Sequence, residues 1–104
     1  MITIYGSDKC KDCVQCKASL DQSGIPYTFI EITQDMMTLK AFLAMRDNDP
    51  ALAKAREKGT VGIPFIIKED GTKTLRWKDT VRDLGGEVIE VNDGTACSLD
   101  GKGC

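Results

Sequence analysis

The chain has 104 residues, of which 41% are hydrophobic and 29% charged, and its net charge is −2 at pH 7. This composition predicts one globular domain with a single core and gives no basic surplus for nucleic acid. No apolar run reaches the roughly 18 residues of a membrane span, and Met1 leads directly into a predicted strand, so we expect no membrane association and a cytoplasmic location. The absence of histidine excludes Cys–His catalysis and histidine metal sites.

The first predicted unit is a strand, a helix and a second strand. An apolar strand at 1–5 and a short polar turn precede a helical pattern that opens at Cys10 and ends at Gly24. Residues 27–32 are rich in β-branched and aromatic side chains and predict the second strand. This strand is expected to be parallel to the first, because a helix connects the two.

The rest of the chain predicts further helices and a β-hairpin. Apolar residues recur at helical spacing after Asp35, Asp49-Pro50 restarts a short helix, and Asp70-Gly71 is a strong hairpin turn. The predicted elements are a helix at 35–46, a short helix at 51–58 stopping at Gly59, antiparallel strands at 65–67 and 73–76, and a last helix capped by Asp79-Thr80 and running through 84. This order predicts an α/β fold with a four-stranded mixed sheet flanked by helices.

The five cysteines are clustered at 10, 13, 16, 97 and 104, which is a poor pattern for a structural disulfide framework. Cys10 falls just ahead of the first helical turn, where free N–H groups and the helix dipole favour a thiolate. Cys13 lies one turn deeper and can approach Cys10 closely enough to close a disulfide. Cys10 is the predicted nucleophile, Cys13 the resolving thiol, and Cys16 a packing residue.

The start of the chain contains Ile4-Tyr5, the Cys10 and Cys13 pair, Val14 and Lys17. In these residues it resembles a glutaredoxin. The resemblance implies a thioredoxin-like (glutaredoxin) fold for residues 1–86, with 87–104 as an extension that carries two cysteines. Glutaredoxins usually have Pro-Tyr between the two cysteines, where this chain has Lys11-Asp12. Lys9 and Lys11 are expected to lower the pKa of Cys10 more than Asp12 raises it.

The resemblance also implies a site for glutathione, as a co-substrate with no tightly bound cofactor and no metal. Thioredoxin-like proteins have a cis proline before the third strand, and Pro64 stands there, so Ile63 would pair with a substrate as a short added strand. Glutaredoxins hold the γ-glutamyl end of glutathione at the start of the last helix, after two glycines that this chain lacks. The family's basic residue before the first cysteine is Ser7 here. Lys9 does not match that position and is the candidate to replace its charge. The other glutathione-binding residues that the resemblance implies are Ile63, Pro64, Trp77, Asp79 and Thr80.

The leading hypothesis is a monomeric dithiol oxidoreductase that reduces protein or glutathione mixed disulfides, with glutathione as electron donor. Trp77 and the missing glycines also resemble the hydrogen donors of ribonucleotide reductase, which thioredoxin reductase reduces. A hypothesis from another class is an iron–sulfur or zinc protein, because Cys10, Cys13 and Cys16 have ferredoxin spacing and a tail cysteine could be the fourth ligand. We expect Cys97 and Cys104 to form a tail pair that catalysis does not need.

Overall fold

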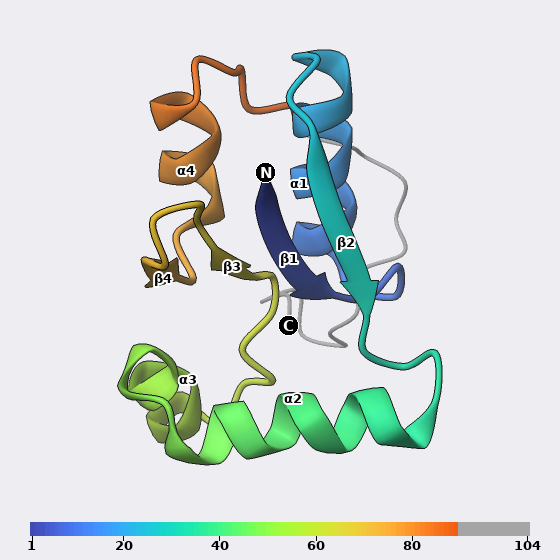
Figure 1. Cartoon of the computed structure of the whole chain (residues 1–104), viewed down its shortest axis with the longest axis vertical. Helices are drawn as coiled ribbons and strands as arrows, with labels where there is room; N and C mark the ends of the chain where they lie inside the picture. Colours follow the sequence, from blue (N-terminus) through green and yellow to red (C-terminus); the bar gives the residue numbers. More distant parts are fainter. Residues whose placement is uncertain (90–104) are drawn as a thin grey trace.

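The computed structural model describes residues 1–89, and Figure 1 shows their arrangement. The elements are β1 (Ile2–Gly6), α1 (Lys11–Gln22), β2 (Tyr27–Glu31), α2 (Met36–Asn48), the 3₁₀ turn η1 (Pro50–Leu52), α3 (Ala53–Lys58), β3 (Phe65–Ile67), β4 (Lys73–Thr74) and α4 (Trp77–Asp83). No helix among residues 1–89 combines the length and the apolar character needed to cross a bilayer. The tail cysteines Cys97 and Cys104 lie outside the described residues.

The four strands form one mixed sheet in the order β2-β1-β3-β4. β1 and β2 are parallel, with Ile4 opposite Phe29, because α1 carries the chain back between them. β3 runs antiparallel to β1, with Ile66 opposite Ile4, and β4 runs antiparallel to β3. The predicted α/β architecture, with a parallel first pair and an antiparallel hairpin, is therefore confirmed.

Each face of the sheet is covered by its own hydrophobic cluster, because alternate side chains of a strand point to opposite faces. One cluster joins the sheet to α1 and α4, and its buried members are Ile2, Ile4, Cys16, Leu20, Ile66, Trp77 and Val81. The other joins the sheet to α2 and α3, and its buried members are Cys10, Cys13, Ile32, Phe42, Leu52, Ala55, Ile63 and Phe65. Figure 1 shows α2 lying across the end of the sheet at which β1 and β2 finish. That end also carries the start of α1.

The last helix begins three residues earlier than predicted, counted from the first predicted cap residue to the observed one. Asp79-Thr80 was the expected cap, but the N-cap is Arg76, without a side-chain hydrogen bond, and Trp77 is the first helical residue. The physical reason is burial: a start at Trp77 puts Trp77, Thr80 and Val81 on one helical face, and all three are buried. Packing of that face outweighs the local preference for an aspartate cap.

Two other boundaries follow from local hydrogen bonds. The short helix opens as a 3₁₀ turn because the Asp49 carboxylate accepts the Ala51 N–H at 2.9 Å, and it ends at Gly59 in the left-handed region, as predicted. β4 is shorter than the predicted strand at 73–76. The Thr74 hydroxyl accepts the Arg76 N–H at 3.0 Å and turns the chain toward α4.

Residues 87–89 form neither helix nor strand and pack against α1. The Ile89 N–H donates to the Ser19 hydroxyl at 2.9 Å, and the Glu87 N–H donates to the Ser23 hydroxyl at 3.0 Å. The first residues of the predicted extension at 87–104 are therefore ordered against α1 as far as Ile89.

Candidate active site

Cys10 and Cys13 lie at the start of α1, directly after β1. Cys10 is the N-cap, and its carbonyl accepts the Val14 N–H at 3.0 Å, which begins the helical hydrogen-bond series. No side chain caps this helix end, and the N–H groups of Asp12 and Cys13 hydrogen-bond the Cys10 sulfur instead. The helix terminus therefore acts on the thiol, as its position in the sequence predicts.

Hydrogen bonding lowers the pKa of Cys10 below its ordinary value. The largest cause is the hydrogen bond from the Cys13 thiol, which stabilises the thiolate against the opposing effect of burial. The Asp12 carboxylate raises the pKa, as predicted. The predicted direction is confirmed, and the N–H groups of the helix terminus contribute to it as predicted. Lys9 and Lys11 are not among its main causes, and the hydrogen bond from the Cys13 thiol takes the place that was predicted for them.

The pKa of Cys13 moves strongly in the opposite direction. Its thiol donates a hydrogen bond to Cys10, it is buried, and it lies next to the charge of the Cys10 thiolate, and all three raise its pKa. Cys10 is 1% exposed and Cys13 is 0% exposed. The pair therefore combines one buried sulfur whose thiolate form is favoured with one buried sulfur that keeps its proton.

Gly6, which the sequence analysis did not single out, provides the space for Cys13. A Cβ atom at Gly6 would lie 2.7 Å from Cys13 Sγ and 3.0 Å from the Phe29 ring. Glycine is the residue that allows a strand to approach the sulfur this closely. The available signal was a glycine at the end of a strand, just before a Cys-x-x-Cys pair.

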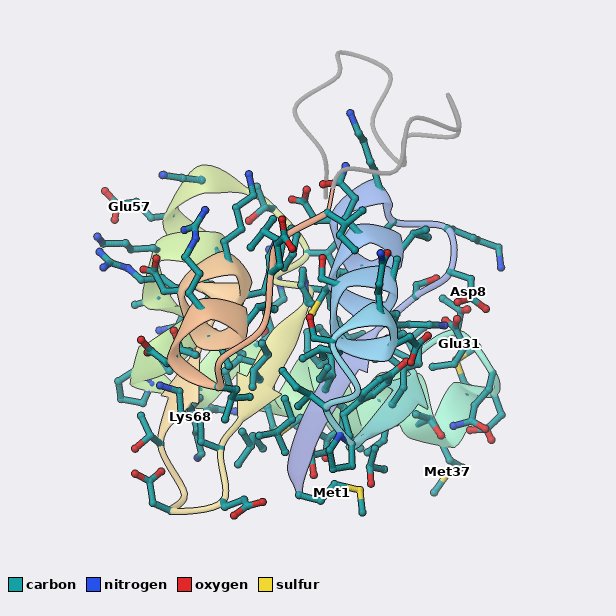
Figure 2. The ribbon with its side chains drawn as sticks, turned by 90° about the horizontal axis from the view of Figure 1, so that it is seen from above. Met1, Asp8, Glu31, Met37, Glu57 and Lys68 are labelled. Atoms are coloured by element: carbon teal, nitrogen blue, oxygen red, sulfur yellow. The ribbon has the colours of Figure 1, made fainter. Side chains whose placement is uncertain are left out.

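Glu31 holds the turn between β1 and α1 against the segment after β2. Its carboxylate accepts the Asp8 N–H at 2.8 Å and the Thr33 N–H at 3.2 Å, and Figure 2 shows Asp8 and Glu31 close together. The Ile32 N–H donates to the Gly6 carbonyl at 2.9 Å. The loop that carries Cys10 and the residues after β2 are therefore fixed relative to one another.

The Ile63–Pro64 peptide bond is cis, as the resemblance implies. Ile63 is 8% exposed and belongs to the same hydrophobic cluster as Cys10. Gly62 precedes it with φ of 92°, a backbone conformation that favours glycine. The loop before β3 therefore brings Ile63 to the side of the sheet on which Cys10 lies.

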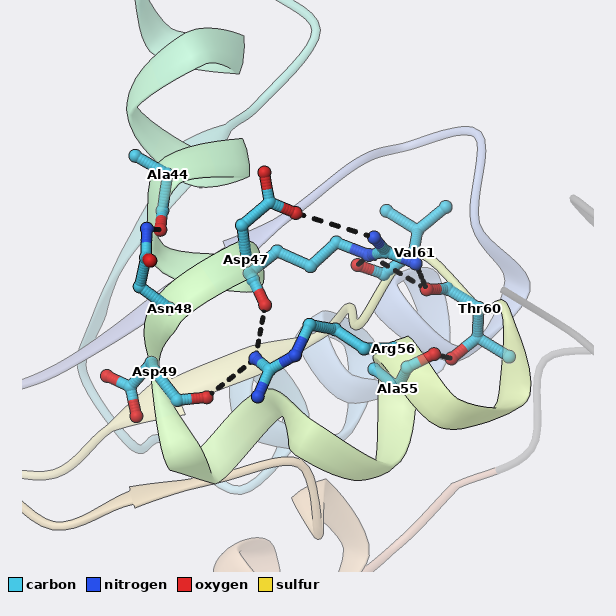
Figure 3. Close-up of polar contacts among 9 residues, drawn as sticks. Ala44, Asp47, Asn48, Asp49, Ala55, Arg56, Thr60 and Val61 are labelled. Atoms are coloured by element: carbon cyan, nitrogen blue, oxygen red, sulfur yellow. Dashed lines mark hydrogen bonds and ion pairs between the residues drawn. The ribbon is translucent and has the colours of Figure 1, made fainter.

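One arginine connects α2 to this loop, and another connects α3 to the end of α2 (Figure 3). The Arg46 guanidinium donates to the Thr60 carbonyl at 2.6 Å and to the Val61 carbonyl at 3.1 Å. Arg56 donates to the carbonyls of Arg46 and Asp49. No local signal in the sequence pointed to either arginine.

Arg46 is expected to be a positioning residue for the loop before Pro64. Replacing Arg46 with methionine should raise KM for a disulfide substrate about tenfold, with a smaller change in kcat, because charged hydrogen bonds worth about 1.5–3 kcal/mol then no longer hold the loop. Arg46→Lys should restore part of the loss. Steady-state kinetics test this, with circular dichroism to confirm folding. An unchanged KM with a reduced kcat would contradict it.

The residues implied to bind glutathione fall into two groups. Trp77 and Asp79 line an open pocket of about 370 Å³ together with Asp12, near the start of α1. Trp77 is only 5% exposed, however, and most of it lies in the core. Thr80 is buried, and its hydroxyl donates to the Arg76 carbonyl at 2.9 Å. Its side chain therefore forms a hydrogen bond within the first turn of α4.

The second group lies on the α2 side of Cys10. Lys9 and Ile63 line a pocket of about 280 Å³ that includes Cys10 itself. Its lining residues are Ser7, Lys9, Cys10, Ile32, Thr33, Leu39, Val61 and Ile63. We call this pocket the apolar groove. Pro64 is buried and is not among the lining residues.

Cys16 does not lie in the same cluster as Cys10 and Cys13. It is fully buried in the cluster on the α1 and α4 side, whereas Cys10 and Cys13 belong to the cluster on the other side of the sheet. Burial raises the pKa of Cys16 to about 12, so its thiol stays protonated. Cys16 thus packs in the core, as predicted. Within residues 1–89, no three or more Cys, His, Asp or Glu side chains are grouped to hold a metal ion.

The pH dependence of Cys10 reactivity follows from these shifts. A lowered pKa keeps Cys10 as a thiolate to lower pH, so the midpoint of its alkylation rate should lie below that of an ordinary thiol, which is about 8.5. Cys13→Ala removes the largest stabilising hydrogen bond and should shift the midpoint upward, whereas Cys13→Ser keeps a donor and should shift it less. Mass-spectrometric peptide mapping after timed alkylation separates Cys10 from the other cysteines. Identical midpoints in the three proteins would disprove the assigned cause.

Comparison with known proteins agrees with this geometry. Residues 2–61, which include Cys10 and Cys13, match the family model for glutaredoxin. An uncharacterized protein of Haemophilus influenzae is 28% identical over 72 residues, which cover 69% of this chain and 84% of that protein. No solved structure gives a significant match. With the family model covering more than half of the chain, and with its thioredoxin-like α/β fold, the protein belongs to the glutaredoxin family.

Proposed function

We propose that the protein is a thiol–disulfide oxidoreductase that reduces protein or glutathione mixed disulfides and is itself re-reduced by glutathione. The observation that carries the proposal is the pair of opposite pKa shifts at the start of α1, lowered at Cys10 and raised at Cys13. A thiolate is the nucleophile of disulfide exchange, and a neighbouring thiol that keeps its proton is available for the second step. Membership of the glutaredoxin family supports the same chemistry.

The proposed reaction balances as two successive exchanges. The Cys10 thiolate attacks one sulfur of the substrate disulfide, the sulfur–sulfur bond breaks, and the other sulfur leaves as a thiolate. Once Cys10 is bonded it carries no charge, so the charge that raises the Cys13 pKa is gone. Cys13 then gives its proton to solvent water or to the thiolate released in the first exchange and attacks the Cys10 sulfur, which releases the second substrate sulfur as a thiolate. Two electrons pass to the substrate, and Cys10 and Cys13 remain as a disulfide.

Two glutathione molecules would return the enzyme to the dithiol form and leave as glutathione disulfide. The pocket lined by Trp77 and Asp79 also contains Arg76, Lys78 and Arg82. Cationic side chains favour the carboxylates that glutathione carries at both ends. Lys9, which is exposed beside Cys10, is the proposed contact for the other end of the molecule.

One observation favours a different electron donor. The first turn of α4 has bulky side chains where the family has two glycines, and Arg76, Trp77 and Lys78 line the pocket there. These side chains restrict the approach of glutathione to the backbone. Reduction by thioredoxin reductase is therefore the second candidate.

The two donors are separated by NADPH-coupled assays that differ only in the reductase. One assay contains glutathione and glutathione reductase, and the other contains thioredoxin reductase, with a mixed disulfide as substrate in both. We expect turnover in the first assay and none in either assay with Cys10→Ser. Turnover only with thioredoxin reductase would refute the glutathione version, and no turnover in either assay would refute the proposed function.

A further inference from the structure

We propose that the apolar groove beside Cys10 binds an apolar side chain of a protein substrate, next to the cysteine that Cys10 attacks. The proposal rests on the disulfide exchange proposed above and specifies its substrate class. The preferred substrates are extended protein segments in which a residue such as leucine, valine or methionine neighbours the disulfide.

The walls of the groove come from separate segments and are mainly aliphatic. Ile32 follows β2, Leu39 belongs to α2, and Val61 and Ile63 come from the loop before β3. Val61 is 42% exposed, so the groove opens to solvent. Its volume of about 280 Å³ falls below the range of roughly 300–1,000 Å³ for drug-sized ligands, which suits a side chain better than a cofactor.

The chemistry of Cys10 decides which molecule occupies the groove. Cys10 forms part of the wall, and in the mixed disulfide the substrate sulfur is bonded to it. A residue of an extended chain spans at most about 3.6 Å, so the neighbours of the substrate cysteine must lie beside the groove. Glutathione has only glycine and a γ-linked glutamate beside its cysteine, and neither offers an apolar side chain. A protein segment can place an apolar side chain in the groove, and glutathione cannot.

The apolar surface continues from the groove along α2. Met36 and Leu43 lie three residues before and four residues after Leu39, which places them on the same side of the helix. They are 66% and 39% exposed. Exposed methionine adapts to differently shaped partners. A substrate segment longer than glutathione can therefore cover further apolar surface on α2, next to the groove.

Hydrogen bonds hold the groove in shape before a substrate arrives. Arg46 fixes the Val61 carbonyl (Figure 3), and Glu31 fixes Thr33 and the turn that leads to Cys10. A preformed groove binds an apolar side chain more tightly, because less conformational entropy of the protein is lost on binding.

The test uses two short peptides, each joined through its cysteine to glutathione, with leucine or serine beside the cysteine. We expect kcat/KM to be about tenfold higher for the leucine peptide, because the leucine side chain buries apolar surface in the groove and the serine side chain does not. Val61→Asp should bring the ratio to about one, and the isosteric Val61→Thr should give an intermediate ratio. Leu84→Asp is the matched control: Leu84 is 43% exposed and does not line the groove, so the ratio should stay tenfold.

The possible results separate the groove from the proposed function. If the protein reduces hydroxyethyl disulfide but treats the two peptides alike, the groove proposal is wrong and the proposed function stands. If it reduces no disulfide, both are wrong. The groove proposal also fails if the tenfold ratio survives in Val61→Asp, or if that substitution raises KM for glutathione as much as for the leucine peptide. A dimer that Val61→Asp dissociates would assign the groove to a second copy of the chain and overturn the proposal.

Discussion

Replacement of Cys10 by serine is expected to abolish disulfide reduction. The substitution removes the sulfur whose thiolate the helix start and the Cys13 thiol stabilise, and a serine hydroxyl is a far weaker nucleophile at neutral pH. The loss should be on the order of a thousandfold or more, as for other catalytic nucleophiles. A coupled assay with a glutathione mixed disulfide measures it.

Cys13→Ser should behave differently, because the attacking thiolate remains and the serine hydroxyl can still donate a hydrogen bond to it. Glutathione can resolve the mixed disulfide in this variant, so turnover of glutathione mixed disulfides should persist. Without glutathione, a covalent adduct between Cys10 and the substrate should accumulate and be visible by mass spectrometry.

Cys16→Ala is the matched control for both substitutions, because Cys16 is buried in the other cluster and its thiol stays protonated. It should keep near-wild-type kinetics. An active Cys10→Ser together with an inactive Cys13→Ser would show that the roles are reversed.

Trp77→Ala is expected to have the largest effect on stability. Trp77 is 5% exposed and packs in the cluster between the sheet, α1 and α4. Truncating a buried aromatic residue costs about 3–5 kcal/mol, which is a large part of the roughly 5–15 kcal/mol by which a typical domain is stable. The free energy of unfolding should be measured in urea by circular dichroism, because Trp77 is the only tryptophan and the variant loses that fluorescence signal.

Two substitutions make the result specific. Trp77→Phe keeps an aromatic ring in the cluster and should cost less, and Leu84→Ala changes a residue that is 43% exposed and should cost little. If Trp77→Ala is as stable as the wild type but shows a raised KM for glutathione, Trp77 is a binding residue and its place in the core is incidental.

Some features of the site were predictable because their causes are local in the chain. The strand before Cys10 and the helix after it follow from side-chain periodicity, and Gly24 and Gly59 end their helices with φ of 70° and 72°. The position of Pro64 came from the family resemblance, and its cis peptide bond is confirmed.

Other features were not predictable because they join residues far apart in the sequence. The hydrogen bonds from Arg46 reach carbonyls 14 and 15 residues away, and nothing in the local pattern identifies them. The apolar groove combines four segments, so none of its parts is unusual when considered alone. The start of α4 was also misplaced, because an aspartate cap is a local signal and the burial of Trp77 is not.

The sequence by itself determined the element order, the position of Cys10 at a helix start and the direction of its pKa shift. These depend on spacing and on the helix terminus, which act within a few residues. Only the tertiary structure decided what lowers that pKa, which hydrophobic clusters contain Cys10, Cys13 and Cys16, and what surrounds Cys10. Burial and hydrogen bonds determine these three features, and both depend on which side chains the fold brings together.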